Sequence, residues 1–543
     1  MIECSALSPC SHLRAVLIFM EGKEPSVAEG SASESPIVAR PPWKSALLVA
    51  TCTFAMITNL ASTGAISIFL PVIGEDLNIP EDKLQWLVSA CSLSSGCFLL
   101  LFGRLADLFG RKKFFLLGII WLSIFCIGCG FAQNATTLYI LRGFQGLGPA
   151  AFLPACLGIL AHGFPESRAR SIAFATFSAG AHRRGAWNAN RRSTCARYSV
   201  KSLRSSCFHV SRNRVFFAST TWRSPFYLFA GMSALCAVGG LFAIDADLPS
   251  TEPDRRVDWF GAFLVTAGLI LLIFVLGQGQ LASHGWRTPY IIALLIVSVL
   301  TVKGDSAPPL MKLSLWTRAN GRFAVIQAIA FLEWSAFLSW YLWSQLYYED
   351  FVKLRPVFAA LRMLPMTVAG ILCNVLVVLT INRVDFSVLV AFGTLCTAVA
   401  ALLFAIIHPA APYWAYGFPS PILAVVGGDF VFAAGTIFVA KISLPHEQSL
   451  AGGLFQTLTQ LGTAFGLAVS TLAHDGAAGQ SRGDQAPLKA YQAAQWTAFG
   501  MAMLCTLLAG VFLRGVGPVG LSGPSKVAQL APEQRDEKLD SKD

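Results

Sequence analysis

The sequence predicts an all-helical protein that crosses a lipid bilayer many times. Hydrophobic residues make up 55% of the 543 residues and charged residues only 13%, whereas soluble domains carry about 25% charged residues. Twelve apolar runs have roughly the 20 residues that a helix needs to cross the hydrocarbon core. Basic residues recur in alternate connections between these runs, which is the charge bias of cytosolic loops. Much of the surface must therefore face lipid.

The predicted spans include two that are disrupted. The long runs cover residues 45–70, 84–102, 114–131, 138–163, 226–244, 260–276, 323–347, 357–381, 388–407, 421–440, 450–472 and 496–513. Two further runs, 171–180 and 288–302, are apolar but short. The basic connections share one side of the membrane only if both short runs also cross it. We therefore expect fourteen spans, with both termini in the cytosol.

This pattern divides the chain into five segments. Met20 is the expected start, because only a brief apolar patch precedes it and a polar stretch rich in serine and proline follows it. The expected segments are a disordered cytosolic tail over 1–43, an N-terminal helical bundle over 44–244, central linker helices and a loop over 245–322, a C-terminal helical bundle over 323–515 and a second disordered cytosolic tail over 516–543.

Short motifs connect the chain to a known family. Residues 103–113, GRLADLFGRKK, resemble the signature loop between spans 2 and 3 of the major facilitator superfamily, and residues 141–148, LRGFQGLG, look like its span-4 motif. Residues 428–430 and 446–453 add a resemblance to the fungal fourteen-span drug:proton antiporter group, particularly its aminotriazole-resistance-like branch. The resemblance implies two six-helix halves, two extra central helices and transport by alternating access.

The signature loop supplies the candidate gate residues Gly103, Asp107, Gly110, Arg111 and Lys112. Glycine permits a tight turn and the close approach of two helices, and a carboxylate is favoured at a helix N-terminus. The family resemblance implies that the loop latches the two halves together during alternating access. The alternative is that its basic residues only anchor the loop in the cytosol.

Polar and charged residues inside the apolar runs are candidates for proton coupling and for the substrate cavity. Arg142, Gln145, Glu333, Asn374 and Asp429 each lie within such a run. A charge inside a span is costly and usually functional, and acids there can carry protons. The alternatives are an arginine that reaches the outer interface and acids that only form structural hydrogen bonds. Further residues that could line the cavity, or join helices, are Gln327, Trp340, Gln345, Gln456 and Gln460.

The chain departs from the family pattern in three places. Position 62 is a serine where drug:proton antiporters often carry an aspartate. Residues 181–214 hold eight arginines, one lysine and no acidic residue where the fifth span is expected, and each arginine would cost about 2.5–3.5 kcal/mol at a helix centre. We interpret 181–221 as the product of a frameshifted or mis-spliced gene; the alternative is an arginine-rich loop that binds anionic lipid. A deletion near 301–309 would explain the shortened eighth span.

These features predict a proton-coupled secondary transporter that exports a small organic molecule, such as a fungal secondary metabolite or a toxic compound. The alternatives are uptake or facilitated transport of a small solute such as ammonium or borate, and a paralogue that no longer transports. An enzyme is disfavoured, because the sequence has no nucleotide-binding loop, no Ser/His/Asp arrangement and no metal-ligand cluster.

The expected partners are the small molecule, protons and the lipid bilayer, without nucleic acid. We expect a monomer that needs no cofactor or metal and lies in the plasma membrane, with the vacuolar membrane as the second candidate. Asn134 begins an Asn-Ala-Thr sequon in an outer loop and is a candidate glycosylation site.

Overall fold

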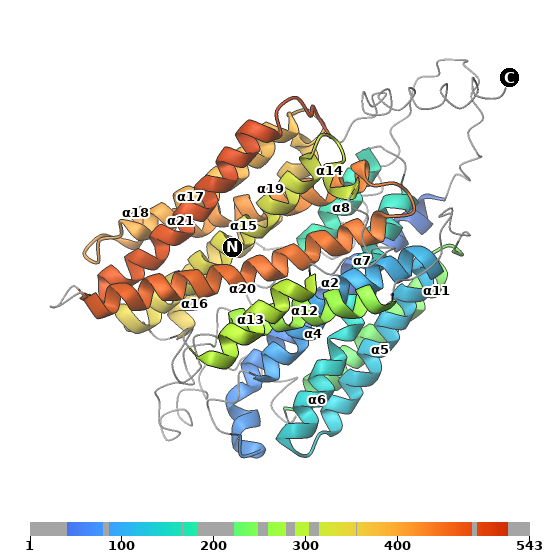
Figure 1. The fold of residues 1–543 in the computed structure, drawn as a ribbon, viewed down its shortest axis with the longest axis horizontal. Coiled ribbons are helices and arrows are strands. Elements are labelled where there is room, and N and C mark those ends of the chain that lie inside the picture. The colour runs from blue at the N-terminus through green and yellow to red at the C-terminus, as the bar shows by residue number, and fades with distance from the viewer. Residues whose placement is uncertain are drawn as a thin grey trace, which may run out of the picture.

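The computed structural model describes residues 41–79, 86–164, 168–181, 222–247, 259–278, 288–302, 314–354, 356–480 and 486–519. Regular secondary structure within these ranges is helical. Eleven helical stretches are long and apolar enough to cross a membrane. The predicted all-helical membrane architecture is therefore confirmed, and its two halves lie side by side in Figure 1.

The N-terminal half is built from seven helices of the described chain. α5 packs against α7 and α11, and α2 packs against α8 and α11. α6 and α7 together form one span that is interrupted at Gly146, where an added Cβ would meet the Cys91 carbonyl of α4. The bounds are α2 (Pro42–Asp76), α4 (Trp86–Phe109), α5 (Arg111–Phe131), α6 (Ala135–Gln145), α7 (Leu147–Gly163), α8 (Arg168–Ala181) and α11 (Ser224–Ala243).

The C-terminal half packs around α15 and α17. α17 contacts α19 and α21, and α15 contacts α20 and α21. Gly462 and Gly466 let α20 approach α15 closely, because a Cβ at either position would collide with the backbone of Phe331 or Ser335. The bounds are α14 (Ser314–Thr317), α15 (Arg322–Leu346), the π-helical turn η3 (Tyr347–Phe351), α16 (Pro356–Thr380), α17 (Phe386–Ala405), α18 (Tyr413–Tyr416), α19 (Pro419–Ile442), α20 (Gln448–Gln480) and α21 (Ala486–Phe512).

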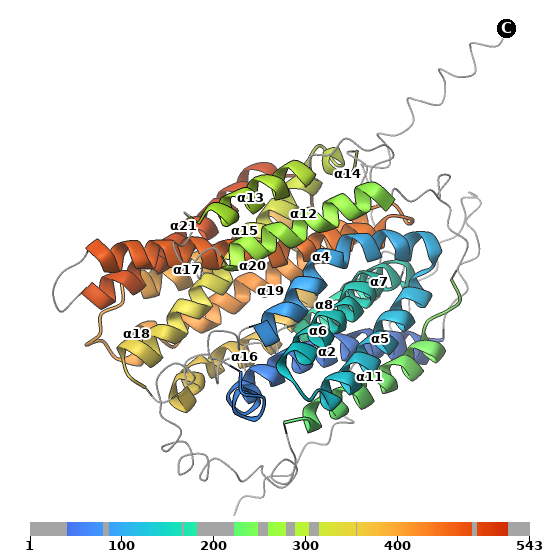
Figure 2. The ribbon, with the colours of Figure 1, turned by 60° about the horizontal axis from the view of Figure 1, so that its bottom comes forward.

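Two additional helices lie over the line where the halves meet. α4 of the N-terminal half packs against α20 of the C-terminal half, and α8 packs against α16 and α19. α12 (Trp259–Gln278) contacts both α4 and α20 and pairs with α13 (Pro289–Val302). Figure 1 shows these two green helices between the blue and orange parts of the molecule, and in Figure 2 they lie along its upper edge with α12 next to α4 and α20. They are the two extra central helices that the sequence predicts.

The outer faces of the spans are apolar. Large hydrophobic side chains on α5, α11, α16 and α17 are exposed, whereas the faces between helices are filled by buried aliphatic and aromatic residues. Without water to satisfy it, a backbone can lie in hydrocarbon only as a helix or a closed barrel, so an exposed apolar belt on helices indicates contact with lipid. Representative exposed residues are Ile124, Leu235, Ile371, Leu372 and Phe392.

Both short predicted spans are short helices in the structure. α8 and α13 have 14 residues each, fewer than the roughly 20 that a crossing requires. The aberrant segment 182–221 lies outside the described residues, as does most of 301–309. At the other end of the chain, residues 516–519 pack onto the C-terminal half: the Gly517 carbonyl accepts a hydrogen bond from Phe386 N at 3.2 Å, and Val519 is buried.

Candidate functional site

Asp107 connects the two halves at the end that the basic loops place in the cytosol. It is buried near the end of α4. Its carboxylate accepts hydrogen bonds from the backbone N–H groups of Ser449 at 3.1 Å and Leu450 at 2.8 Å. These groups belong to the first turn of α20, whose N–H groups have no partner within the helix. An acid of one half thus caps a helix of the other, and the helix dipole strengthens the contact.

Arg111 completes this connection. Its guanidinium binds Asp107 at 2.8 Å and donates to the Gly158 carbonyl of α7 at 3.1 Å, both within the N-terminal half. It also reaches the C-terminal half, where it donates to the Pro445 carbonyl and, at 3.4 Å, to Gln448 Oε1. We call the contacts of Asp107 and Arg111 with residues 445–450 the latch.

Two glycines of the signature loop are required by close approach. A Cβ on Gly103 would lie 2.9 Å from the Ser449 carbonyl oxygen, so a larger residue would push α4 away from α20. Gly110 has φ 117°, a conformation that side chains other than glycine rarely adopt. A Cβ there would also collide with the carboxylate of Asp247.

Asp247 is a site residue that the sequence analysis does not identify. Its carboxylate accepts hydrogen bonds from the backbone N–H groups of Lys112 at 2.8 Å and Lys113 at 3.2 Å, in the first turn of α5. In return, Lys112 Nζ donates to the carbonyls of Leu241 at 3.0 Å and Ile244 at 2.5 Å, at the end of α11. This reciprocal cap fixes α5 to α11 and so holds the neighbouring Arg111 in place.

Two further polar contacts lie close to the latch. Glu447 is buried and forms an ion pair with Arg318 at 2.8 Å. Arg170 of α8 donates to the Ala440 carbonyl at the end of α19 at 3.0 Å, which is a further bond between the halves outside the latch. Glu447 lies within the 446–453 motif of the sequence analysis. For Arg170 and Arg318 the sequence signal is a charge near an apolar run, which also describes many residues that only set topology.

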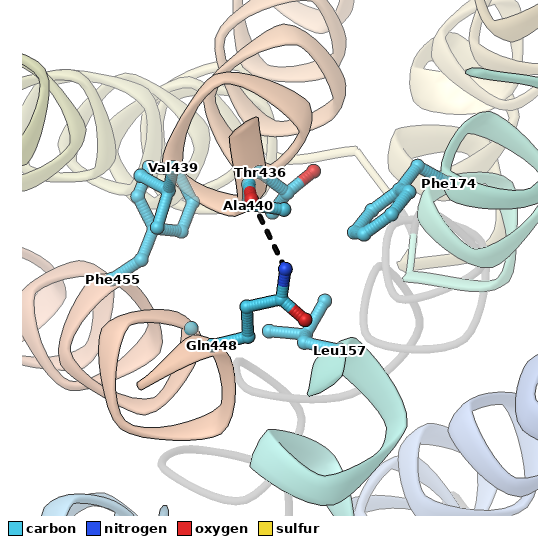
Figure 3. A pocket seen from close by; sticks show the side chains of 8 residues that line it. Leu157, Phe174, Thr436, Val439, Ala440, Gln448 and Phe455 are labelled. Carbon is cyan, nitrogen blue, oxygen red and sulfur yellow. Dashed lines mark hydrogen bonds between the residues drawn. The ribbon is translucent and has the colours of Figure 1, made fainter. Parts of the chain in front are cut away.

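A small pocket lies between the halves directly beside the latch. It is lined by residues of α7, α8, α19 and α20. Figure 3 shows Gln448 reaching toward Ala440, with Leu157 beside it and Phe174 on the side away from Val439 and Phe455. Because Gln448 also accepts from Arg111, the floor of the pocket and the latch share a side chain. The lining residues are Leu157, Phe174, Thr436, Val439, Ala440, Gln448, Gly452 and Phe455.

Arg142 and Gln145 form a buried polar group in the N-terminal half. Neither residue is exposed. Arg142 Nε donates to the Leu87 carbonyl and Nη1 to Gln145 Oε1, each at 2.8 Å. Gln145 in turn donates to the Cys126 sulfur at 2.9 Å. Within the described residues Nη2 of Arg142 has no hydrogen-bond partner, so the guanidinium keeps a free donor inside the bundle.

The buried acids lie in the C-terminal half. Glu333 of α15 accepts a hydrogen bond from the Thr397 hydroxyl of α17, and its Oε2 has no partner among the described residues. Asp429 of α19 accepts from Asn374 of α16 at 3.0 Å. The structure thus pairs Asp429 with Asn374 and Arg142 with Gln145. The ion pairs of the described chain do not join Arg142 to either acid.

Known proteins resemble this chain in sequence and in fold. A low affinity ammonium transporter of Saccharomyces cerevisiae is 28% identical over 87% of this chain and 88% of its own length. The efflux pump terJ of Aspergillus terreus is 26% identical over 78% of this chain and 81% of its own length. The aminotriazole resistance protein of S. cerevisiae is 25% identical over 91% of this chain and 89% of its own length. The crystal structure of the human organic anion transporter MFSD10 superposes with a TM-score of 0.59 at 14% identity, covering 87% of this chain and all of that one.

The model of the Major Facilitator Superfamily matches residues 52–182, which include the latch residues of α4 and α5. The chain has the fold of the major facilitator superfamily and matches its model over this segment. It is a multi-pass membrane protein similar to transporters of this family, and the matched region ends one residue after α8.

Two other predicted positions have local roles in the structure. Ser62, which stands where drug:proton antiporters often carry an aspartate, is buried and donates to the Asn59 carbonyl of its own helix at 2.8 Å. Asn134 is exposed and caps α6, accepting a hydrogen bond from Thr137 N at 2.8 Å. This bond uses the side-chain oxygen and leaves the amide nitrogen, the atom that carries a glycan.

Proposed function

We propose that this protein is a major facilitator transporter that exports a small organic molecule in exchange for protons. The observation that carries the proposal is Glu333, a carboxyl group that is not exposed, lies within a membrane-spanning stretch and keeps one oxygen without a partner in the described residues. An uncompensated acid in a span is expensive and marks ion or proton pathways. The relatives named efflux pump and aminotriazole resistance protein favour export of an organic compound.

The second proton site in this proposal is Asp429 with Asn374. An amide can donate a hydrogen bond to an ionised carboxylate and accept one from a protonated carboxyl group. Asn374 Nδ2 donates to Asp429 Oδ2 at 3.0 Å, and this oxygen can accept the bond both in the ionised acid and when the proton is on Oδ1. In the N-terminal half, the free donor of Arg142 is suited to an anionic or carbonyl oxygen of the substrate.

Alternating access requires a contact that forms in one state and breaks in the other. The latch meets this requirement, because its bonds from Asp107 and Arg111 to residues 445–450 cross between the halves. In this conformation the transporter is closed at the end that the basic loops assign to the cytosol. We infer that protonation of the C-terminal half is followed by release of the latch.

A second candidate function is transport of ammonium or a similar small solute. The relative named low affinity ammonium transporter favours it, since the match spans 491 residues. Ser62 is compatible with both functions, because its hydroxyl is used within its own helix. The probe that moves on a pH gradient distinguishes the two.

The test uses the full chain in proteoliposomes with an imposed pH gradient. Ethidium and aminotriazole serve as organic probes, and methylammonium serves as the ammonium probe. We expect the pH gradient to drive an organic probe, and we expect Glu333→Gln to abolish this movement. Asp350 is an exposed acid at the far end of the same helical stretch as Glu333. It provides the control Asp350→Asn, which should transport at the wild-type rate. Movement of methylammonium alone would favour the second function, and gradient-driven transport by Glu333→Gln would refute the proton role.

A further inference from the structure

We propose that Glu349 is the site at which the transporter takes up protons from the outer side. This inference rests on the proposed proton exchange and adds the point of entry. Glu349 lies in η3, the π-helical turn that continues α15 at the end opposite to the latch. It is 7% exposed. None of the candidate residues of the sequence analysis lies in this turn.

The two oxygens of Glu349 have different surroundings. Oε1 accepts a hydrogen bond from Gln345 Nε2 at 3.2 Å, one helical turn earlier. Oε2 is buried and has no hydrogen-bond partner among the described residues. A buried carboxylate with an unmatched oxygen is costly, and a proton on that oxygen removes the charge. The amide of Gln345 keeps its bond to the other oxygen in both states.

The π-helical turn places this acid among aromatic rings. Tyr347 stacks on Phe351 with 5.3 Å between the ring centroids and lies edge-on to Tyr348 at 5.5 Å. Tyr347 and Phe351 both contact Tyr491 of α21, with centroids 6.2 and 6.3 Å apart. Single π-helical turns occur often at functional sites, because the extra residue redirects a side chain. Here the turn keeps Glu349 buried while the next residue, Asp350, is exposed.

Among the described residues Glu349 has no counter-ion: its neighbour Asp350 is itself an acid, and Lys353 is exposed. On α16, the Arg362 guanidinium lies over the rings of Tyr348 and Tyr413, 4.9 and 5.3 Å from their centroids. On α21, Tyr491 packs against the turn, and Lys489 is exposed. The ion pairs of the described residues do not include Glu349. Among the described residues nothing neutralises the carboxylate of Glu349, and a proton on Oε2 would do so.

Glu349 and Glu333 lie on one continuous helical stretch, sixteen residues apart. At 1.5 Å per residue this separation is about 24 Å, which is most of the thickness of the hydrocarbon core. Each acid has one oxygen without a partner among the described residues. The geometry therefore provides an outer proton acceptor at the end of the span and a second acceptor deep within it.

The test measures proton binding directly and transport separately. Infrared difference spectra between acidic and neutral pH are recorded for the full chain in nanodiscs, and ethidium efflux on a pH gradient is measured in proteoliposomes. The variants are Glu349→Gln, which cannot bind the proton, Glu349→Asp, which can, and Asp350→Asn as the control at an exposed neighbour. Size-exclusion profiles verify that each variant is folded.

We expect Glu349→Gln to lose one protonated-carboxyl band and to lower gradient-driven efflux to the level of protein-free vesicles. Exchange of ethidium at equal pH should persist, and Glu349→Asp should recover part of the driven efflux. A Glu349→Gln variant that matches the wild type in spectrum and efflux would overturn the inference. Loss of the same band in Asp350→Asn would overturn it as well. A wild-type protein that moves no probe on a pH gradient would instead reject the proposed function, and with it the transport role of Glu349.

Discussion

Replacing Asp107 by asparagine should open the latch while preserving the shape of the side chain. Only bonds between the halves count, since the pair of Asp107 with Arg111 lies within the N-terminal half and survives opening. Two bonds cross to α20, from Ser449 N and Leu450 N. Hydrogen bonds to a charged group contribute about 1.5–3 kcal/mol, and neutral ones about 0.5–1.5 kcal/mol.

An asparagine can accept one of these bonds as a neutral group but presents an N–H toward the other donor. Replacing two bonds to a charged group by one neutral bond should remove about 1.5–5.5 kcal/mol from the closed conformation. At about 1.4 kcal/mol per factor of ten, the ratio of open to closed molecules should rise at least about tenfold. Arg111 still reaches Pro445, so the closed state should not vanish completely.

The assay is a distance measurement across the latch. Phe109 is 52% exposed and Leu444 is 45% exposed, so spin labels at cysteines introduced there report on the two halves. The described native cysteines are buried and should react slowly. Asp107→Asn should add a population of longer distances, whereas Asp475→Asn, which changes an exposed acid, should not. An unchanged distance distribution in a folded Asp107→Asn protein would refute the reasoning.

Three further predictions follow from the packing and the caps. Gly118→Ala should lower the melting temperature, because the added Cβ would lie 2.7 Å from a carbonyl oxygen of α7 and overpacking costs about 1–3 kcal/mol. The control Gly143→Ala should not lower it, because the atom nearest to the added Cβ is 3.8 Å away. Arg142→Lys keeps the charge but cannot reproduce the planar guanidinium that makes two hydrogen bonds. The transport rate should fall at least about tenfold, which corresponds to the loss of one hydrogen bond to a charged group, while the yield of folded protein should stay the same. Asp247→Asn should accelerate hydrogen exchange of the first-turn amides of α5 that it caps, and equal protection in the variant would contradict the cap.

Several predicted spans differ from the observed helices at their ends. α21 begins at Ala486, ten residues before the predicted start at 496, and α2 runs over 35 residues to Asp76. Hydropathy identifies the part of a helix that lies in hydrocarbon, but a helix continues beyond it for as long as its backbone bonds and packing allow. Trp222, which donates to Asp76 at 2.8 Å, is one such contact beyond the apolar run.

Apolar length and loop charge predicted a bundle of membrane helices, and the family resemblance implied two halves with two additional central helices. In hydrocarbon only helices and closed barrels satisfy the backbone hydrogen bonds. The length of an apolar run and the charge of a loop are local properties that can be read along the chain. The sequence also indicated the signature loop, since glycines, an acid and basic residues coincide between two spans. The partners of that loop could not be read in this way.

Which residues contact one another depends on how the helices pack. Asp107 and Leu450 are separated by 343 positions, and the bond between them arises because α4 packs on α20. Asp247 and Glu349 look in the sequence like any acid near the end of a span. Packing places Asp247 as a cap on the first turn of α5. It buries Glu349, whose Oε2 has no hydrogen-bond partner among the described residues. Burial and partners depend on distances between remote segments, which hydropathy along the chain does not contain.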